Sequence, residues 1–344
     1  MSIENPELGK LDQKSFSELI APYLPKSSSL ILGPKFGSDY AAVSLSEGQV
    51  LVTSTDPLAL SPELGWKRSA RLALQVVVAD VAVSGIPPNY LVVNWNLPLP
   101  LEDRDFREIW REFCSEAESR GILIIGGHTG RYSGLDFPIA GSATVFGTGA
   151  PSDLLMPTDV EVGDQIVLFN EPAAEAAGIF SYYFPDRLSS DLGSKDLNHL
   201  QTLFEALDPI TDFTHLSALP EMVMLHDLAE GGLLGGLQEV VSSAGLGTEI
   251  ERSKIDLDPV VKEACNLLRL DPLQVTSVGA GLGIVRKGKV SDLLKKTKAR
   301  RIKATPIGSI ISEREVAIGT ESGRNLITEP IRDRFWNRLE EFSK

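Results

Sequence analysis

The sequence has few cysteines and a deficit of positive charge, and each shortage excludes a class of protein. Its 344 residues include only two cysteines, Cys114 and Cys265, and both fall inside helical patterns. This predicts reduced thiols in a cytoplasmic protein and argues against a disulfide framework or a zinc site. A formal net charge of -14 argues against a basic surface that binds nucleic acid.

Long hydrophobic runs are also missing. No uninterrupted apolar stretch of about 18 residues is present, so we expect no membrane span. The first residues, MSIENPELGKLDQ, lack the basic start and apolar run of a signal peptide. The hydrophobic content of 42% and the length are sufficient for two globular domains. Because the pattern pauses at Pro151 to Pro157, we expect the domains to be residues 1–154 and 155–344. Strands and helices alternate without βαβ periodicity, which favours the α+β class.

Asp80 lies where a carboxylate is unexpected. The segment from Ser69 to Pro88 is almost wholly Ala, Leu and Val, and predicts a core helix that ends near Gly85. At about 100° per residue, Arg71 and Gln75 share one face and Asp80 points roughly opposite. An ionised carboxylate in apolar surroundings costs several kcal/mol unless it is paired or binds a cation. The helix alone favours a salt bridge or cap contact over a shared cation.

Three further aspartates lie where strands meet loops. Asp39 follows a glycine-containing loop, and Asp56 ends a strand that Pro57 is expected to stop. Asp227 ends the strand MVMLHD, directly before the turn Gly231-Gly232 and an apolar helix. Backbone NH groups and a positive helix end beside a carboxylate suit a phosphate with a cation. An N-cap aspartate with closely packed glycines explains this turn equally well.

Two glycine loops give weaker signals. The loop from Gly33 to Gly37 contains Lys35 and could hold a phosphate, although it is not a Walker A sequence. The segment Gly126-Gly127-His128-Thr129 follows a predicted buried strand and could bring polar groups to a ligand. An ordinary turn and an ordinary strand exit are the commoner explanations. The remaining histidines have no metal-ligand spacing, and we interpret them as surface or satisfied groups: His199, His215 and His226.

Taken in order, these segments resemble the AIR synthase-like superfamily of ATP-binding enzymes, over nearly the whole chain. The second domain resembles the hydrogenase expression/formation (carbamoyl dehydratase) branch most, through Leu270-Asp271-Pro272-Leu273 and Ser277-Val278-Gly279-Ala280. The other matching segments are GSDYAAV at 37–43, STD at 54–56, DVAVSGIP at 80–87, GGHT at 126–129 and DLAEGGL at 227–233. No single segment is decisive, but six in register are fairly specific.

The resemblance implies a homodimer formed by strands of the N-terminal domain, an α/β sandwich as second domain, and Mg-ATP as ligand. It implies Mg²⁺ binding by Asp39, Asp56 and Asp80. It implies nucleotide contacts from Lys35, Gly37, Gly126, Gly127, His128, Thr129, Asp227, Gly231 and Gly232. The expected reaction is phosphoryl transfer to an oxygen of an amide- or phosphate-bearing substrate, small or protein-bound. No catalytic residue is identified. For the dimer, we expect apolar strand edges at Val50 to Thr55 and Tyr90 to Trp95.

The sequence departs from the family pattern at three places. Tyr40 stands where the family has a second aspartate, and His128 replaces an acidic residue; neither is a good Mg²⁺ ligand. The carbamoyl dehydratase branch acts on a cysteine at its own C-terminus, whereas the last cysteine here is Cys265. The alternative function is therefore a nucleotide-binding regulatory or scaffold paralogue without turnover.

Overall fold

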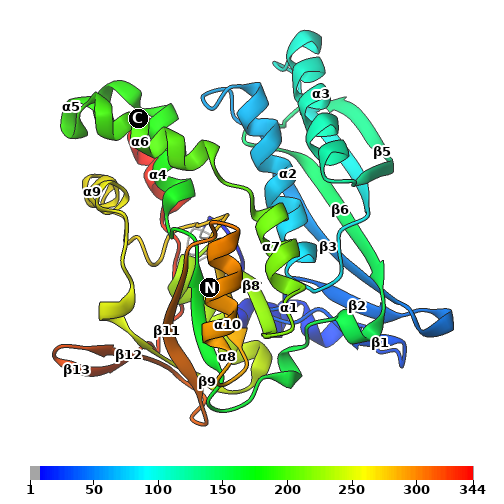
Figure 1. The fold of residues 1–344 in the computed structure, drawn as a ribbon. Helices are drawn as coiled ribbons and strands as arrows, with labels where there is room; N and C mark the ends of the chain where they lie inside the picture. The colour runs from blue at the N-terminus through cyan, green and yellow to red at the C-terminus, as the bar shows by residue number, and fades with distance from the viewer. Residues whose placement is uncertain (1–7, 344) are drawn as a thin grey trace.

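Two mixed β-sheets, each covered by helices, make up the computed structural model, which describes residues 8–343 (Figure 1). The α+β class with two sheet domains, predicted from the irregular order of strands and helices, is confirmed. A short helix, α1 (Gln13–Leu19), precedes the first sheet. No helix among the described residues is long and apolar enough to cross a membrane.

The N-terminal sheet has six strands in the order β1-β2-β3-β6-β4-β5. Only β4 and β5 pair in parallel. The strands are β1 (Leu30–Leu32), β2 (Ala41–Ser44), β3 (Val50–Ala59), β4 (Tyr90–Pro98), β5 (Leu123–Tyr132) and β6 (Ile139–Gly149). Helices α2 (Trp66–Ala82) and α3 (Asp103–Ser119) pack on one face through alternate residues of the strands, including Val52, Val93 and Val145. The residues between them, such as Thr53, Val92 and Phe146, stay half-buried on the other face.

Strand β3 continues through Pro57 to Ala59, so the predicted stop at Asp56 is wrong. Strand β2 pairs with β3 only from Val50 to Thr53 of β3. Beyond Thr53, β6 is the only neighbour of β3 among the described strands. Pro57 therefore lies where β3 has one free edge, and a missing backbone NH is tolerated on such an edge. Asp56 is consequently a residue inside the strand, paired with Ala143 of β6 on one side.

The predicted burial of the strand before Gly126 is also wrong. Strand β5 is the last strand of the sheet, and its side chains are largely exposed, with Leu123 at 60% and Ile125 at 55%. The expected loop from Gly126 to Thr129 lies inside this strand. The expected apolar edges at residues 50–55 and 90–95 belong to β3 and β4, which have neighbours on both sides. The two edge strands of this sheet are β1 and β5.

The C-terminal sheet has seven strands in the order β13-β12-β9-β11-β7-β10-β8. The strands are β7 (Gln165–Phe169), β8 (Met222–Asp227), β9 (Gly247–Glu251), β10 (Gly281–Val285), β11 (Ala304–Ile311), β12 (Val316–Thr320) and β13 (Gly323–Leu326). Helix α8 (Gly232–Ala244) packs on one face, and α7 (Pro209–Ser217) and α10 (Val290–Ala299) pack on the other. The other helices form a separate apolar cluster: α4 (Ala174–Tyr183), α5 (Pro185–Leu192), α6 (Ser194–Glu205), α9 (Pro259–Leu268) and α11 (Phe335–Ser343).

Helix α2 joins the two domains, and α7 lies beside it (Figure 1). The hydroxyl of Ser217 on α7 donates to the carbonyl of Ala82 at 2.9 Å. The amide of Gln75, only 2% exposed, donates to the carbonyl of Leu207 at 2.7 Å. Arg71 pairs with Glu205 at 2.8 Å. The polar face of α2 is therefore an interdomain contact, and one apolar core continues from the N-terminal sheet to α7, β8 and α10.

Candidate functional site

Four aspartates from separate elements lie close enough to affect one another's charge. Asp39 is in the loop after Gly37, Asp56 is in β3, Asp80 is near the end of α2, and Asp227 is the last residue of β8. Burial is the largest cause that raises the pKa of Asp80 well above its ordinary value, and the charges of the other three aspartates add to it. The fold thus brings together the three predicted metal ligands and Asp227.

Asp56 and Asp80 face each other between β3 and α2. The Ser54 hydroxyl donates to Oδ2 of Asp80 at 2.6 Å. Burial is the largest cause that raises the pKa of Asp56, and among the described residues no donor is bonded to the buried Oδ2 of this side chain, whose carboxyl group faces Asp80. An unsatisfied buried carboxylate oxygen is costly, and carboxylate oxygens are the ligands that Mg²⁺ prefers. The donor set at this point therefore fits a hard divalent cation.

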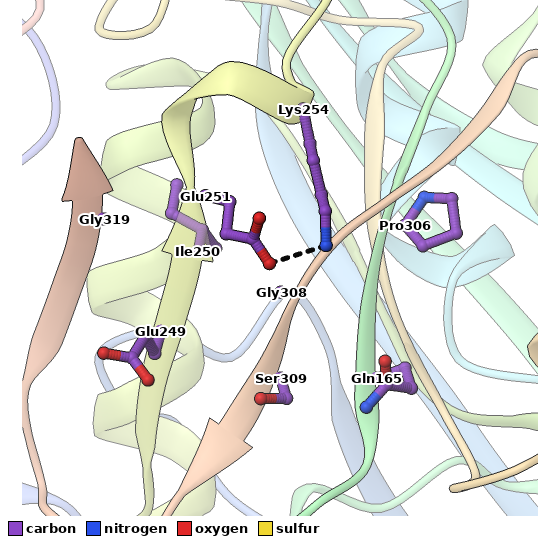
Figure 2. Close-up of a pocket in the computed structure, with 9 residues that line it drawn as sticks. All are labelled: Gln165, Glu249, Ile250, Glu251, Lys254, Pro306, Gly308, Ser309 and Gly319. Atoms are coloured by element: carbon purple, nitrogen blue, oxygen red, sulfur yellow. Dashed lines mark hydrogen bonds and ion pairs between the residues drawn. The ribbon is translucent and has the colours of Figure 1, made fainter. Parts of the chain in front are cut away.

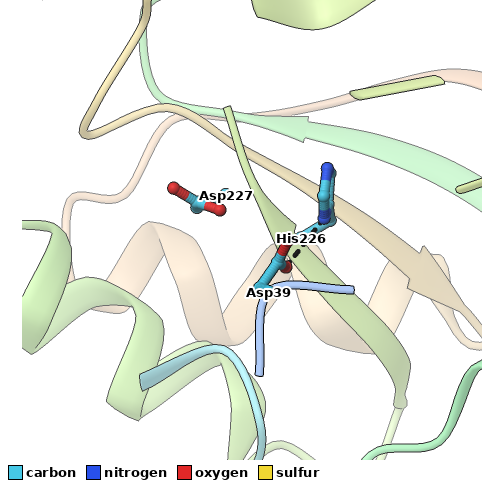
Figure 3. A group of neighbouring side chains, drawn as sticks. All are labelled: Asp39, His226 and Asp227. Carbon is cyan, nitrogen blue, oxygen red and sulfur yellow. Dashed lines mark hydrogen bonds and ion pairs between the residues drawn. The ribbon is translucent and has the colours of Figure 1, made fainter. Parts of the chain in front are cut away.

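Asp227 and Asp39 lie close together, with His226, where the cluster meets β8 of the C-terminal sheet (Figure 3). Burial and then the charge of Asp39 raise the pKa of Asp227 to about 7. One ligand atom from each of these three residues lies within 4.8 Å of the others. By distance alone, the three could hold a metal ion.

His226, however, is a cation in this arrangement and not a metal ligand. Its Nδ1 donates to Asp39 at 2.7 Å and its Nε2 donates to Glu239 at 2.9 Å, so both ring nitrogens face carboxylates. Burial would lower the pKa of His226, but Asp39 and the two hydrogen bonds raise it well above its ordinary value. An imidazolium has no lone pair for a metal. His226 fixes the orientation of Asp39 instead.

Glu239, on α8, links this histidine to the N-terminal segment. Its other oxygen accepts from the Lys10 ammonium at 2.6 Å. Burial would raise the pKa of Glu239, but the hydrogen bond from His226 and the charge of Lys10 lower it to about 2. Glu239 is therefore ionised at neutral pH, with a cation on each side.

Lys35 and Gly37 hold the Asp39 loop against α8. The Lys35 ammonium donates to the carbonyl of Ser243 at 2.9 Å, near the end of that helix. Gly37 has a φ of 80°, and a Cβ added there would lie 2.4 Å from the carbonyl oxygen of Glu239. Both residues, assigned to a phosphate from the sequence, thus have a structural role in placing Asp39.

In the turn before α8, the NH groups of Gly231 and Gly232 are already hydrogen-bonded. The NH of Gly231 donates to Asp333 at 3.0 Å, and the NH of Gly232 donates to the carbonyl of Ala229 at 3.0 Å. The left-handed φ values of 89° and 54° explain why both positions are glycine. A phosphate bound by the Gly231 NH would have to displace the Asp333 carboxylate.

Gly126, Gly127, His128 and Thr129 lie away from the cluster of their own chain. Asp56, Ala143, Val93 and Gly127 occupy one register row across β3, β6, β4 and β5. Asp56 and Gly127, at the two ends of this row, are three strand spacings apart, which is roughly 14 Å between their backbones. His128 bonds to the Tyr132 hydroxyl at 2.8 Å on the exposed strand.

The hydroxyl of Tyr40 forms no hydrogen bond with the acid cluster among the described residues. Tyr40 is buried, and its hydroxyl donates to the carbonyl of Leu155. Burial is the largest cause that raises its pKa above the ordinary value. Tyr40 therefore ties the Asp39 loop to the segment between β6 and β7.

A separate hollow of about 320 Å³ lies on the C-terminal sheet (Figure 2). Its floor is formed by β9, β11 and neighbouring residues, and Lys254 pairs with Glu251 there at 2.6 Å. None of the residues predicted for the site lines it. The hollow is therefore separate from the acid cluster.

Three charged residues of the cluster are missing from the predicted set: Lys10, His226 and Glu239. A signal was present for His226, because it interrupts an otherwise apolar strand, MVMLHD, and a buried polar group needs a partner. Glu239 interrupts the apolar helix α8 as Asp80 interrupts α2. Lys10 has no local signal, since only the tertiary fold brings it to α8.

Comparisons with known proteins agree with this fold. The family profile described as AIR synthase related protein, N-terminal domain, matches residues 37–149, and the C-terminal domain profile matches residues 161–320. The carbamoyl dehydratase HypE of Azotobacter vinelandii is 27% identical over 289 residues, which are 80% of this chain and 79% of that protein.

Solved structures extend the likeness to three dimensions. A structure titled as a HypE-HypF complex has a TM-score of 0.71 at 20% identity, covering 86% of this chain and 94% of that chain. A structure of the hydrogenase maturation protein HypE in complex with ATP has a TM-score of 0.65 at 20% identity, covering 96% and 97%. At such identity these structures show the fold. With both family profiles matched in order, the chain belongs to the AIR synthase related family and is similar to hydrogenase maturation proteins.

Proposed function

We propose that this protein binds Mg-ATP at the acid cluster and transfers a phosphoryl group to an oxygen of a small or protein-bound amide or phosphate substrate. The observation that carries the proposal is the unpartnered buried Oδ2 of Asp56, which faces Asp80 and lies near two more aspartates. A Mg²⁺ ion held by Asp39, Asp56 and Asp80 would neutralise these charges and bridge to the triphosphate. ATP in a structure of a HypE relative supports the choice of nucleotide.

The test is calorimetric titration of the protein with ATP, in Mg²⁺ and in a chelator. We expect binding that chelation weakens at least tenfold and that Asp56→Asn weakens similarly. Asp212→Asn is the matched control, because Asp212 is half-buried and bonded to Asn170 at 2.9 Å, outside the cluster. ATP affinity that is indifferent to the chelator would contradict the metal site.

Turnover is a separate question, because Tyr40 and His128 stand where the family has acids. Tyr40 is bonded to Leu155, and a phenol with a raised pKa does not replace a carboxylate ligand. This observation favours the second candidate, a nucleotide-binding regulatory or scaffold paralogue. Mg²⁺-dependent ATP hydrolysis, measured with and without amide donors, distinguishes the two. Hydrolysis above a no-enzyme blank, abolished by Asp56→Asn, supports the enzyme; tight ATP binding without hydrolysis supports the paralogue.

We also propose that the protein is a cytoplasmic homodimer that uses the N-terminal sheet. The half-buried face of this sheet and the exposed β5 edge offer apolar side chains to a second copy. Reduced cysteines at 114 and 265 fit the cytoplasm. In such a dimer, Gly126 to Thr129 could contact a nucleotide of the other subunit. Sedimentation at micromolar concentration should give a dimer, and a monomer would contradict this proposal.

A further inference from the structure

The segment before α1 crosses α8 and brings Lys10 to the acid cluster; residues 9–13 are called the N-terminal strap below. The backbone NH of Lys10 donates to Glu230 at 2.6 Å, beside the start of α8. Gly9 packs so closely there that an added Cβ would lie 2.7 Å from Oε2 of Glu230. At the other end, the Gln13 amide donates to the Ser242 hydroxyl at 3.3 Å. The strap is therefore fixed at both ends of the helix.

Leu11, the apolar side chain of the strap, is 52% exposed, so polar contacts and charge decide the position of the strap. Lys10 and Gln13 are exposed, whereas Glu239, which Lys10 contacts at 2.6 Å, is 9% exposed. Besides the two hydrogen bonds at its ends, the strap is held by the ion pair of the Lys10 ammonium with the buried Glu239. Lys10 and His226 are the cations that the described residues place on Glu239.

The Lys10 ammonium retains free donors at the mouth of the cluster. Its side chain is 55% exposed, and one of its three NH donors is used by Glu239. Desolvation of the ammonium opposes its charge, but the charges of Glu239, Asp39 and Asp227 outweigh it and raise the pKa of Lys10 above its ordinary value. The group is a permanent cation within range of the aspartates.

We propose that Lys10 is a ligand-binding residue of the site and that its two free NH donors bind a phosphate oxygen of the nucleotide. This rests on the proposed function, because Mg²⁺ on the aspartates would bring the polyphosphate to the cluster. An ammonium and a phosphate form a charge-assisted hydrogen bond, which is about twice as strong as a neutral one. The strap would then close over the polyphosphate while Gly9 and Gln13 keep their contacts on α8.

The experiment measures the dissociation constants of Mg-ATP and of adenosine for the full chain and for Lys10→Met. We expect Lys10→Met to weaken Mg-ATP roughly tenfold and to leave adenosine unchanged, since adenosine has no phosphate. Lys14→Met, a change of an exposed lysine four residues further on, should alter neither constant. Lys10→Arg should keep most of the affinity for Mg-ATP.

A double variant separates this role from simple neutralisation of Glu239. If Lys10 only balances the buried Glu239 charge, Lys10→Met with Glu239→Gln should restore the affinity for Mg-ATP, and that result would overturn the proposal. If Lys10 binds phosphate, the double variant stays weak although its thermal stability recovers. Unchanged Mg-ATP affinity in Lys10→Met would overturn this inference alone. A wild-type protein that does not bind Mg-ATP would overturn the proposed function and this inference together.

Discussion

Asp80 is the residue on which the sequence and the structure can be compared most directly. Its place on an apolar helix predicts a partner, and the helix alone favours a salt bridge. The structure places three carboxylates and the Ser54 hydroxyl around it, with no cation bonded directly to it among the described residues. Like charges at such a site raise each other's pKa unless a cation lies between them.

We predict that Asp80→Asn weakens Mg-ATP binding at least tenfold and keeps the fold. An asparagine oxygen can still accept from Ser54, while the loss of one negative charge removes repulsion and a cation ligand. Calorimetry and thermal unfolding are measured together, with Asp212→Asn as the control. The salt-bridge interpretation would be correct if the variant unfolded while wild-type binding ignored a chelator.

Glu175 allows a prediction on pH, away from the acid cluster. It is buried at the start of α4 and accepts from the Thr276 hydroxyl and the Val278 NH, both at 2.8 Å. Burial raises its pKa from 4.5 to about 7, and these hydrogen bonds offset this in part. Between these two values the folded state holds a proton that the unfolded state has lost, so this group makes the protein less stable as pH rises.

We therefore predict that Glu175→Gln changes the pH dependence of the free energy of unfolding. Near pH 4.5 the variant and the wild type should be similar, and near pH 8 the variant should be more stable, by up to about 3 kcal/mol. Urea unfolding at several pH values measures this. A difference that stays constant from pH 5 to 8 would show that Glu175 does not titrate in this range.

The site could be predicted only where the local sequence marks a residue, and not where a contact joins residues far apart in the chain. The local sequence marks four aspartates as unusual, because an acid in an apolar or glycine-rich segment requires a binding partner. They are Asp39, Asp56, Asp80 and Asp227. Lys10 has no such mark, since its partner Glu239 is 229 residues away in the sequence. A free NH at Gly231 was expected wrongly for the same reason, because the carboxylate that accepts from it, Asp333, belongs to a distant segment of the chain.

At the scale of elements, the contact between the Asp39 loop and α8 is the tightest in the site. Gly37 has a left-handed φ of 80°, and its Cα faces the backbone of Glu239. Gly48 has a similar φ of 72°, with nothing within 4 Å of an added Cβ. The two positions share the backbone strain and differ only in the space available.

We predict that Gly37→Ala destabilises the protein by several kcal/mol and Gly48→Ala by about 1 kcal/mol. The difference measures the cost of moving the loop away from α8. Urea unfolding gives both values, and Mg-ATP binding should weaken in Gly37→Ala because Asp39 moves with the loop. Equal effects of the two substitutions would show that the loop can shift without cost.

The elements also show what a periodic pattern can and cannot determine. The predicted apolar helices agree with α2 and α8, because a helix that is apolar over most of its surface is buried in a core. Strand β5 has an apolar start but lies at the edge of its sheet, and strand order is not encoded in the local pattern. Pro57 was misleading because the length of β2, not the proline, decides which edge of β3 is free.

For the whole molecule, the common core of the two domains determines stability. Val77 on α2 belongs to the same cluster as Phe213 on α7 and Val285 on β10. We predict a single cooperative unfolding transition and an unfolded fragment 1–154, because the cut would expose the second side of α2. Circular dichroism of the fragment and of the full chain measures this. A fragment with a sharp unfolding transition of its own would contradict it.

This shared core affects how the chain folds during synthesis. The ribosome releases the N-terminal sheet first, but the apolar cluster that α2 shares with α7 and β8 extends to Ile302, so it is complete only when residues up to Ile302 have emerged. At roughly 5 to 20 residues per second, the delay after residue 154 lasts from several seconds to about half a minute. During that time part of this shared apolar cluster stays uncovered. Nascent chains paused before β10 should therefore bind chaperones that recognise apolar segments, and chains paused after β11 should release them.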